Sequence, residues 1–87
     1  MKIIYKESFV NRFENQLDFI AEDKLSAARK FRKDILERIK EIPSNPYSFR
    51  KSIYFEDVLI RDLIFKGYTI VFRINKDQIE VFGFVKY

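Results

Sequence analysis

The sequence has no cysteine and no histidine, and these two absences remove most of the usual catalytic chemistry. Without cysteine the chain has no thiol nucleophile and no thiolate ligand for zinc. Without histidine it has no imidazole general base, no Ser-His pair and no imidazole ligand for a transition metal. The acidic residues also lack the spacing of a metal site, so we expect no metal and no cofactor. Any reaction here would have to use Arg, Lys, Tyr, Asp or Glu.

Glycine and proline are scarce as well, with two of each among 87 residues. This excludes a glycine-rich phosphate loop and a flexible linker, so we expect one domain over residues 1–87. No apolar run approaches 18 residues, and no targeting segment is visible. A cytoplasmic protein without a membrane partner is therefore the expectation.

Aromatic residues are abundant: the chain has ten Phe and five Tyr, and 47% of all residues are hydrophobic. A domain of this size buries only about 60% of its unfolded surface, so it needs such a dense core. The net charge is +4, which favours an acidic protein or a polyanion as partner. Acids are interspersed throughout, unlike the pattern of a dedicated nucleic-acid arm.

The N-terminal half has the pattern of a strand followed by two helices. Residues 2–7 are rich in β-branched and aromatic side chains, which predicts a strand. Apolar residues then recur every three or four positions after Ser8, which predicts a helix with Ser8 as its N-cap. The same spacing resumes after Asp23 and ends before Pro43, which predicts a second helix capped by Asp23.

From Ser52 onward the hydrophobic period changes to two, which is typical of strands. We expect four strands, at residues 52–55, 58–65, 68–74 and 78–85. The predicted fold class is α+β: an N-terminal strand, a helical hairpin and an antiparallel β-meander, with the helices packed on one face of the sheet.

The last hairpin permits a prediction of register. If paired residue numbers always sum to 153, the ion pair Arg73–Glu80 forms across the strands, and Ile70 lies opposite the small Gly83. The same register places Ile74 opposite Ile79, Phe72 opposite Val81, Val71 opposite Phe82, Thr69 opposite Phe84 and Tyr68 opposite Val85.

This register leaves apolar side chains on both faces of the hairpin, whereas two helices cover only one. Val71, Phe82 and Phe84 would then form an exposed apolar patch, which favours a protein partner. The alternatives are that another segment covers this face, or that sheet twist and long side chains such as Arg61 and Lys86 shield it.

Three groups of residues, each with a basic side chain, are candidates for chemistry. Arg50 and Lys51 follow aromatic residues, a combination that suits RNA contacts but also an ordinary loop. Arg61 lies in mid-strand among apolar neighbours, where it needs a partner, such as an acid of this chain, or solvent. Lys86 and Tyr87 could together supply an acid or base group, provided that the tyrosine pKa is shifted.

Several segments, taken in order, are similar to those of a known family. They are Ile-Ile-Tyr-Lys (3–6), Phe-Ile-Ala-Glu-Asp (19–23), Ala-Ala-Arg-Lys-Phe (27–31), Ile-Pro-Ser-Asn-Pro (42–46), Ile-Arg-Asp-Leu-Ile (60–64), Gly-Tyr-Thr-Ile-Val-Phe-Arg-Ile (67–74) and the closing Ile-Glu-Val-Phe-Gly-Phe-Val-Lys (79–86). Over essentially its whole length the chain resembles the RelE/ParE toxins of bacterial type II toxin–antitoxin systems. The resemblance implies a microbial RNase-like fold and a growth-inhibiting toxin. It also implies a cognate antitoxin, whose disordered tail folds across the toxin and would contact Val71, Phe82 and Phe84.

The resemblance leaves the mode of action between two branches. RelE-like members cut mRNA on the ribosome and usually carry Arg directly after Gly-Tyr, where this chain has Thr69. At the C-terminal end they carry sequences such as Arg-Tyr-His-Tyr, where this chain has Phe84-Val85-Lys86-Tyr87, so that Phe84 replaces an arginine and Lys86 a histidine. ParE-like members inhibit DNA gyrase and need no catalytic residues. These departures, the two missing arginines above all, favour the ParE-like branch.

The other possibilities remain open at this stage. If the chain is instead a ribosome-dependent mRNA endoribonuclease, the resemblance implies Arg61, Lys86 and Tyr87 as its catalytic residues, with Arg50 and Lys51 holding RNA. A third alternative, from another class, is a degenerate module that binds the antitoxin and no longer poisons a target.

Overall fold

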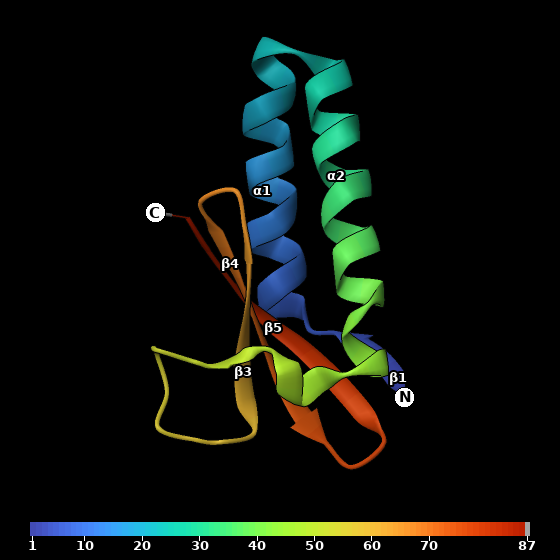
Figure 1. Ribbon diagram of the computed structural model, residues 1–87. Helices are drawn as coiled ribbons and strands as arrows, with labels where there is room; N and C mark the ends of the chain where they lie inside the picture. The colour runs from blue at the N-terminus through green and yellow to red at the C-terminus, as the bar shows by residue number, and fades with distance from the viewer. Residues whose placement is uncertain (87) are drawn as a thin grey trace.

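The computed structural model describes residues 1–86, which begin with a short strand and a helical hairpin (Figure 1). Strand β1 is Lys2–Tyr5, helix α1 is Glu7–Asp23 and helix α2 is Leu25–Lys40. A single residue, Lys24, separates the helices; its backbone is extended and its N–H donates to the carbonyl of Ile20. The predicted helical hairpin is thus confirmed.

The rest of the described chain forms the sheet. Two short 3₁₀ turns, Ile42–Ser44 and Pro46–Ser48, lead to strands β2 (Arg50–Lys51), β3 (Ile60–Phe65), β4 (Tyr68–Asn75) and β5 (Gln78–Lys86). The strand order is β1-β5-β4-β3-β2, with β1 parallel to β5 and the other pairs antiparallel. The α+β fold predicted from the sequence is confirmed.

Both predicted helix caps are wrong. Helix α1 begins one residue before Ser8, whose hydroxyl instead donates to the carbonyl of Phe82 (2.6 Å) and ties the helix start to β5. Asp23 is the last residue of α1, and Lys24 occupies the N-cap position of α2. A one-residue connection leaves no separate position for a cap beyond the end of α1.

The helices cover one face of the sheet, and the core lies between them (Figure 1). Helix α1 contributes Phe9 and Phe13, whose rings stack at 5.2 Å, and α2 contributes Ile35 and Ile39. The sheet contributes Leu63, Ile70, Phe72, Ile74, Ile79, Val81 and Phe84. Burial of these large side chains supplies the apolar area that a small domain requires.

The predicted register of the last hairpin holds only near the turn. Strand pairing confirms Ile74 opposite Ile79, Arg73 opposite Glu80 and Phe72 opposite Val81. The Glu80 carboxylate, however, accepts a hydrogen bond from the Asn75 amide (3.2 Å), and no Arg73–Glu80 salt bridge is found within residues 1–86. Beyond this point the predicted register is wrong by one residue.

The cause is a β-bulge at Phe82, where β5 carries one residue more than β4. Val71 therefore lies opposite Gly83 and Ile70 lies opposite Phe84. A Cβ at Gly83 would lie 2.9 Å from the Cβ of Val71, so the close approach requires glycine. The bulge turns Phe84 from the outer face into the core, where it meets the aromatic rings of α1. The same shift places Thr69 opposite Val85 and Tyr68 opposite Lys86.

The predicted strand 52–55 is also wrong. Strand β2 comprises only the two residues before it, and residues 52–59 form a loop without a ladder, which we call the 52–59 loop. The Ser52 N–H still donates to the carbonyl of Ile60 in β3 (2.9 Å), but the amide groups of Ile53, Tyr54 and Leu59 bond to side chains. The other strands lie where the period-two pattern placed them, apart from a few residues at their ends.

Candidate functional site

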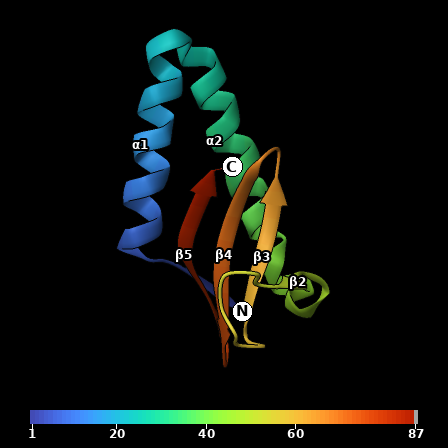
Figure 2. The same cartoon turned by 90° about the vertical axis from the view of Figure 1, so that its left-hand side faces the viewer.

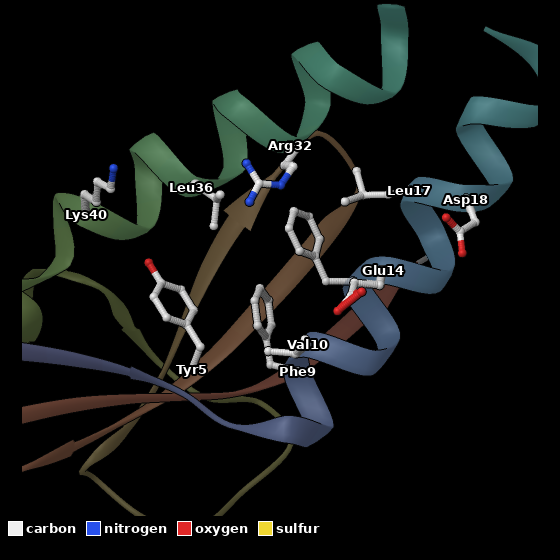
Figure 3. Close-up of a pocket in the computed structure, with 10 residues that line it drawn as sticks. Tyr5, Phe9, Val10, Glu14, Leu17, Asp18, Arg32, Leu36 and Lys40 are labelled. Atoms are coloured by element: carbon white, nitrogen blue, oxygen red, sulfur yellow. The ribbon is translucent and has the colours of Figure 1, made fainter. Parts of the chain in front are cut away.

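A cleft of about 650 Å³ lies between α1 and α2 on the side of β1 (Figure 3). Its apolar lining consists of Phe9, Val10, Phe13, Leu17 and Leu36. Tyr5 stands at one end, with its hydroxyl pointing toward α2. Partial burial raises the pKa of Tyr5, because desolvation disfavours the phenolate. The hydroxyl therefore stays protonated and can donate a hydrogen bond into the cleft.

The two walls of this cleft carry opposite charge. Glu14 and Asp18 lie along α1, whereas Arg32 and Lys40 lie along α2. The salt bridges within α2 join other residues, namely Lys30 to Asp34 and Lys33 to Glu37, with a third between Arg38 and Glu41 at its end. Within residues 1–86, no salt bridge involves the four charged residues of the cleft. Their charges are thus available to a ligand.

The outer face of the sheet, which points away from the helices, carries the 52–59 loop (Figure 2). The loop crosses in front of the strands, and the Phe55 ring packs edge-on against Phe82 at 5.6 Å. Val71 beneath it is only 2% exposed. A hollow of about 340 Å³ remains beside the loop, lined in part by Tyr54, Phe55 and Arg12.

This arrangement corrects the predicted apolar patch. Val71 is covered, and Phe84 is 5% exposed on the opposite face of the sheet, so only Phe82 offers partly exposed side chain. The patch of three residues is therefore wrong as an exposed surface, since a loop covers the outer face and the bulge redirects Phe84. Contact of these three residues with an antitoxin stays a prediction.

Asp62, in strand β3, anchors the 52–59 loop to the sheet. Its side chain is 0% exposed, and its Oδ2 accepts hydrogen bonds from the Arg50 guanidinium (3.1 Å) and the Ile53 backbone N–H (3.1 Å). The second oxygen, Oδ1, is buried without a hydrogen bond. Arg50 is thus engaged with a carboxylate of its own chain, at a position where the sequence favoured RNA contact or an ordinary loop.

Arg61 is occupied by its own chain as well. Its guanidinium donates to the backbone carbonyls of Val58 (2.8 Å), Phe49 (3.0 Å) and Tyr47 (3.4 Å), and it lies over the Tyr47 ring at 5.2 Å. Carbonyl oxygens, rather than the expected acid, satisfy this mid-strand charge. Arg61 thereby fixes the segment between the second 3₁₀ turn and β3, and its Nε and Nη1 donors are directed at the protein itself.

The structure does not bring the predicted catalytic residues together. Arg61 pairs with Phe72 and Lys86 with Tyr68, on strands that flank β4. The two positions are therefore about 14 Å apart along the strands and roughly 10 Å apart across them. The Lys86 ammonium lies over the Phe19 ring of α1 (5.4 Å). Tyr87 lies outside the described residues, so its role stays a prediction.

Sequence reasoning missed three features of these surfaces: the charged cleft, the anchoring role of Asp62 and the apolar loop. The cleft residues share one helical face each, yet their juxtaposition depends on the angle between α1 and α2. Asp62 lies in the middle of a predicted strand, between Arg61 and Leu63, and a carboxylate at such a position is a signal of a buried, paired group. The remaining candidate, Lys51, pairs with Arg61 at the sheet edge and is exposed.

Within residues 1–86 there is no group of three or more histidine, cysteine or acidic side chains that could hold a metal ion. None of the helices within these residues is long and apolar enough to cross a membrane. The surfaces that stand out are instead a charged apolar cleft and an apolar loop, which are features of protein recognition.

The element order and the sheet define a small α+β protein with a helical hairpin packed on one face of a five-stranded sheet. Residues 3–86 match the model of the family described as ParE toxin of type II toxin-antitoxin system, parDE. The chain therefore belongs to the ParE toxin family. A search of curated proteins found no match.

Proposed function

We propose that this ParE-family chain arrests bacterial growth in the cytoplasm by binding DNA gyrase, and that a cognate antitoxin neutralises it. The choice of gyrase binding over mRNA cleavage rests on the hydrogen bonds that the Arg61 guanidinium makes. A ribonuclease needs cations aimed at the scissile phosphate, where charge develops in the transition state. Arg61 instead donates to three backbone carbonyls and lies far from Lys86.

Expression of the chain in bacteria without its antitoxin tests this proposal. We expect growth arrest with intact mRNA, and we expect the purified protein to inhibit supercoiling by purified gyrase. The readouts are growth, mRNA cleavage mapping and a supercoiling assay. A folded protein that leaves growth unaffected would support the degenerate antitoxin-binding module.

Cleavage of mRNA on the ribosome would contradict the gyrase proposal and favour the endoribonuclease alternative. In that case Tyr87→Phe should abolish cleavage, with Lys86 contributing charge. Exposed Lys51 would then be a candidate for RNA contact. A supercoiling assay that stays at the control level would contradict gyrase inhibition directly.

We further propose that the α1–α2 cleft receives an amphipathic helix of the antitoxin. The cleft has an apolar floor for the hydrophobic face of such a helix, and walls of opposite charge for its flanks. A helix that carries bases beside α1 and acids beside α2 would match both walls. The net charge of +4 adds a general attraction for an acidic partner.

Reversing the charge of the α2 wall of the cleft should weaken the complex with the antitoxin. The double variant Arg32→Glu with Lys40→Glu is expected to bind the antitoxin encoded beside this chain about tenfold or more weakly, with the loss largest at low salt. The matched control is Arg29→Glu with Lys33→Glu, which changes the charge equally outside the cleft and should stay within about twofold. Titration calorimetry at two salt concentrations measures both. Equal loss in the two variants would contradict the cleft as the docking site.

A further inference from the structure

The cleft between α1 and α2 ends, beside β1, in two hydrogen-bond donors. Tyr5 extends from β1 with its hydroxyl toward α2, and Lys40, the last residue of α2, lies at the same end (Figure 3). The raised pKa of Tyr5 keeps its hydroxyl protonated, and a lysine ammonium has donors only. Within residues 1–86 the Tyr5 hydroxyl has no hydrogen-bond partner and Lys40 has no salt bridge.

No carboxylate of the chain competes for these donors. Glu41 follows Lys40 directly but forms a salt bridge with Arg38 (3.4 Å). Glu7, at the start of α1, does not line the cleft. The acids that do line it lie further along α1, away from Tyr5 (Figure 3). The β1 end of the cleft is therefore open to an acceptor from a partner.

The charge of the cleft changes along its length. Lys24 alone joins the two antiparallel helices, so residues equally far from Lys24 in sequence lie at about the same level of the hairpin (Figure 1). Asp18 precedes Lys24 by six residues and Lys40 follows it by sixteen. At the rise of an α-helix, the two levels differ by about 15 Å. Glu14 and Arg32 lie between them on opposite walls, which leaves donors at the β1 end and a carboxylate toward the tip.

This distribution specifies the charges of a helix that fills the cleft. Such a helix matches both ends when it carries an acid at the β1 end and a base near Asp18. A separation of about 15 Å corresponds to roughly three helical turns, so both charges lie on one face with apolar residues between them. The apolar residues would contact the floor formed by Val10, Leu36 and their neighbours.

We propose that the Tyr5 hydroxyl and the Lys40 ammonium together bind one carboxylate of the antitoxin helix and thereby set its register in the cleft. This inference rests on the proposed function, in which that helix occupies the cleft, and adds the contact that selects it. A bound helix covers the Tyr5 hydroxyl, so a helix that lacks the carboxylate, or is shifted by one turn, leaves a buried donor unpaired. The cost of that unpaired donor discriminates against non-cognate antitoxins.

The test removes the two donors without changing the shape of the cleft. Tyr5→Phe deletes only the hydroxyl and keeps the ring near Phe9, and Lys40→Gln deletes the charge. The matched control is Tyr54→Phe with Lys33→Gln, because Tyr54 is 42% exposed and Tyr5 is 37% exposed, and Lys33 lies on α2 outside the cleft. Thermal melting verifies folding, and titration calorimetry with the antitoxin encoded beside this chain measures affinity.

We expect Tyr5→Phe to bind the antitoxin about tenfold more weakly, because a hydrogen bond to a charged acceptor is lost. The double variant Tyr5→Phe with Lys40→Gln should bind about 30-fold more weakly or worse, and the control should stay within about twofold of wild type. Each Asp and Glu of the antitoxin is also changed to Asn or Gln. One of these changes should weaken binding to the wild-type chain about tenfold or more and have little further effect on the double variant.

Two results would overturn the inference alone. They are wild-type affinity in Tyr5→Phe, and additive effects for every carboxylate of the antitoxin. In either case, weaker binding of the variant Arg32→Glu with Lys40→Glu would leave the cleft as the docking site. If that charge-reversed variant binds like its own control, or the wild-type chain does not bind the antitoxin, the proposed docking fails and the inference fails with it.

Discussion

Replacing Phe84 by alanine is expected to lower the free energy of unfolding by about 3–5 kcal/mol. The ring is buried between α1 and the sheet, and its centroid lies 5.6 Å from that of Phe13, 6.0 Å from that of Phe9 and 5.3 Å from that of Tyr68. Deleting it removes these contacts and leaves a cavity that the stacked rings on either side cannot readily fill. A domain of this size has a total stability of about 5–15 kcal/mol, so part of the population would unfold. Urea denaturation followed by circular dichroism measures the effect.

The matched control for this substitution is Phe82→Ala, two residues earlier at the bulge. Phe82 is half-buried and its ring contacts Phe55, so we expect a loss of about 1 kcal/mol. Similar losses at the two positions would contradict the bulged register, because a regular hairpin would place both rings on the same face.

Replacing Asp62 by alanine is expected to cost about 2–4 kcal/mol of stability. The substitution removes the acceptor of the Arg50 guanidinium and leaves the Ile53 N–H, which is partly buried, without its partner. The loss stays below that of a fully buried ion pair because Arg50 is partly exposed and can be hydrated. The 52–59 loop should open first, so faster amide exchange at Ile53 and proteolytic cleavage within the loop are the measurements.

A conservative variant separates the charge of Asp62 from its shape. Asp62→Asn keeps an oxygen that can accept the Ile53 N–H but loses the charge that attracts Arg50. Asp62→Asn should therefore lower the free energy of unfolding less than Asp62→Ala does. Amide exchange at Ile53 should also be slower than in the alanine variant. If Asp62→Ala left stability and loop protection unchanged, the carboxylate would not be the anchor of the loop.

The sequence predicted the elements that depend on local pattern. The three- and four-residue spacing identified both helices, and the period of two identified β3, β4 and β5. Ser8 and Asp23 misled as caps because the tertiary fold used them differently: one ties α1 to β5, and the other completes the last turn of α1. Local sequence pattern could not predict the bulge at Phe82, because the bulge is stabilised by the burial of Phe84 against α1, which is distant in the sequence.

The candidate site was less predictable because its parts come from distant segments. Residue type marked Arg61 as unusual, but its carbonyl partners belong to a turn far back in the sequence. The residues 52–55 alternate like a strand, yet Asp62 and Ser52 capture their amide groups and hold a loop instead. Which apolar groups are exposed depends on where that loop crosses the sheet, and the sequence pattern carries no information on this.

The parallel pairing of β1 with β5 has a consequence for how the protein comes into being. The first strand in chain order pairs with the last, from Lys2 opposite Gln78 to Tyr5 opposite Val81. Before β5 emerges from the ribosome, β1 has no partner in the sheet and Phe9 and Phe13 lack the ring of Phe84. Late closure of this kind makes folding depend on nearly the whole domain being synthesised. A nascent chain therefore cannot complete the five-stranded sheet before β5 has been synthesised.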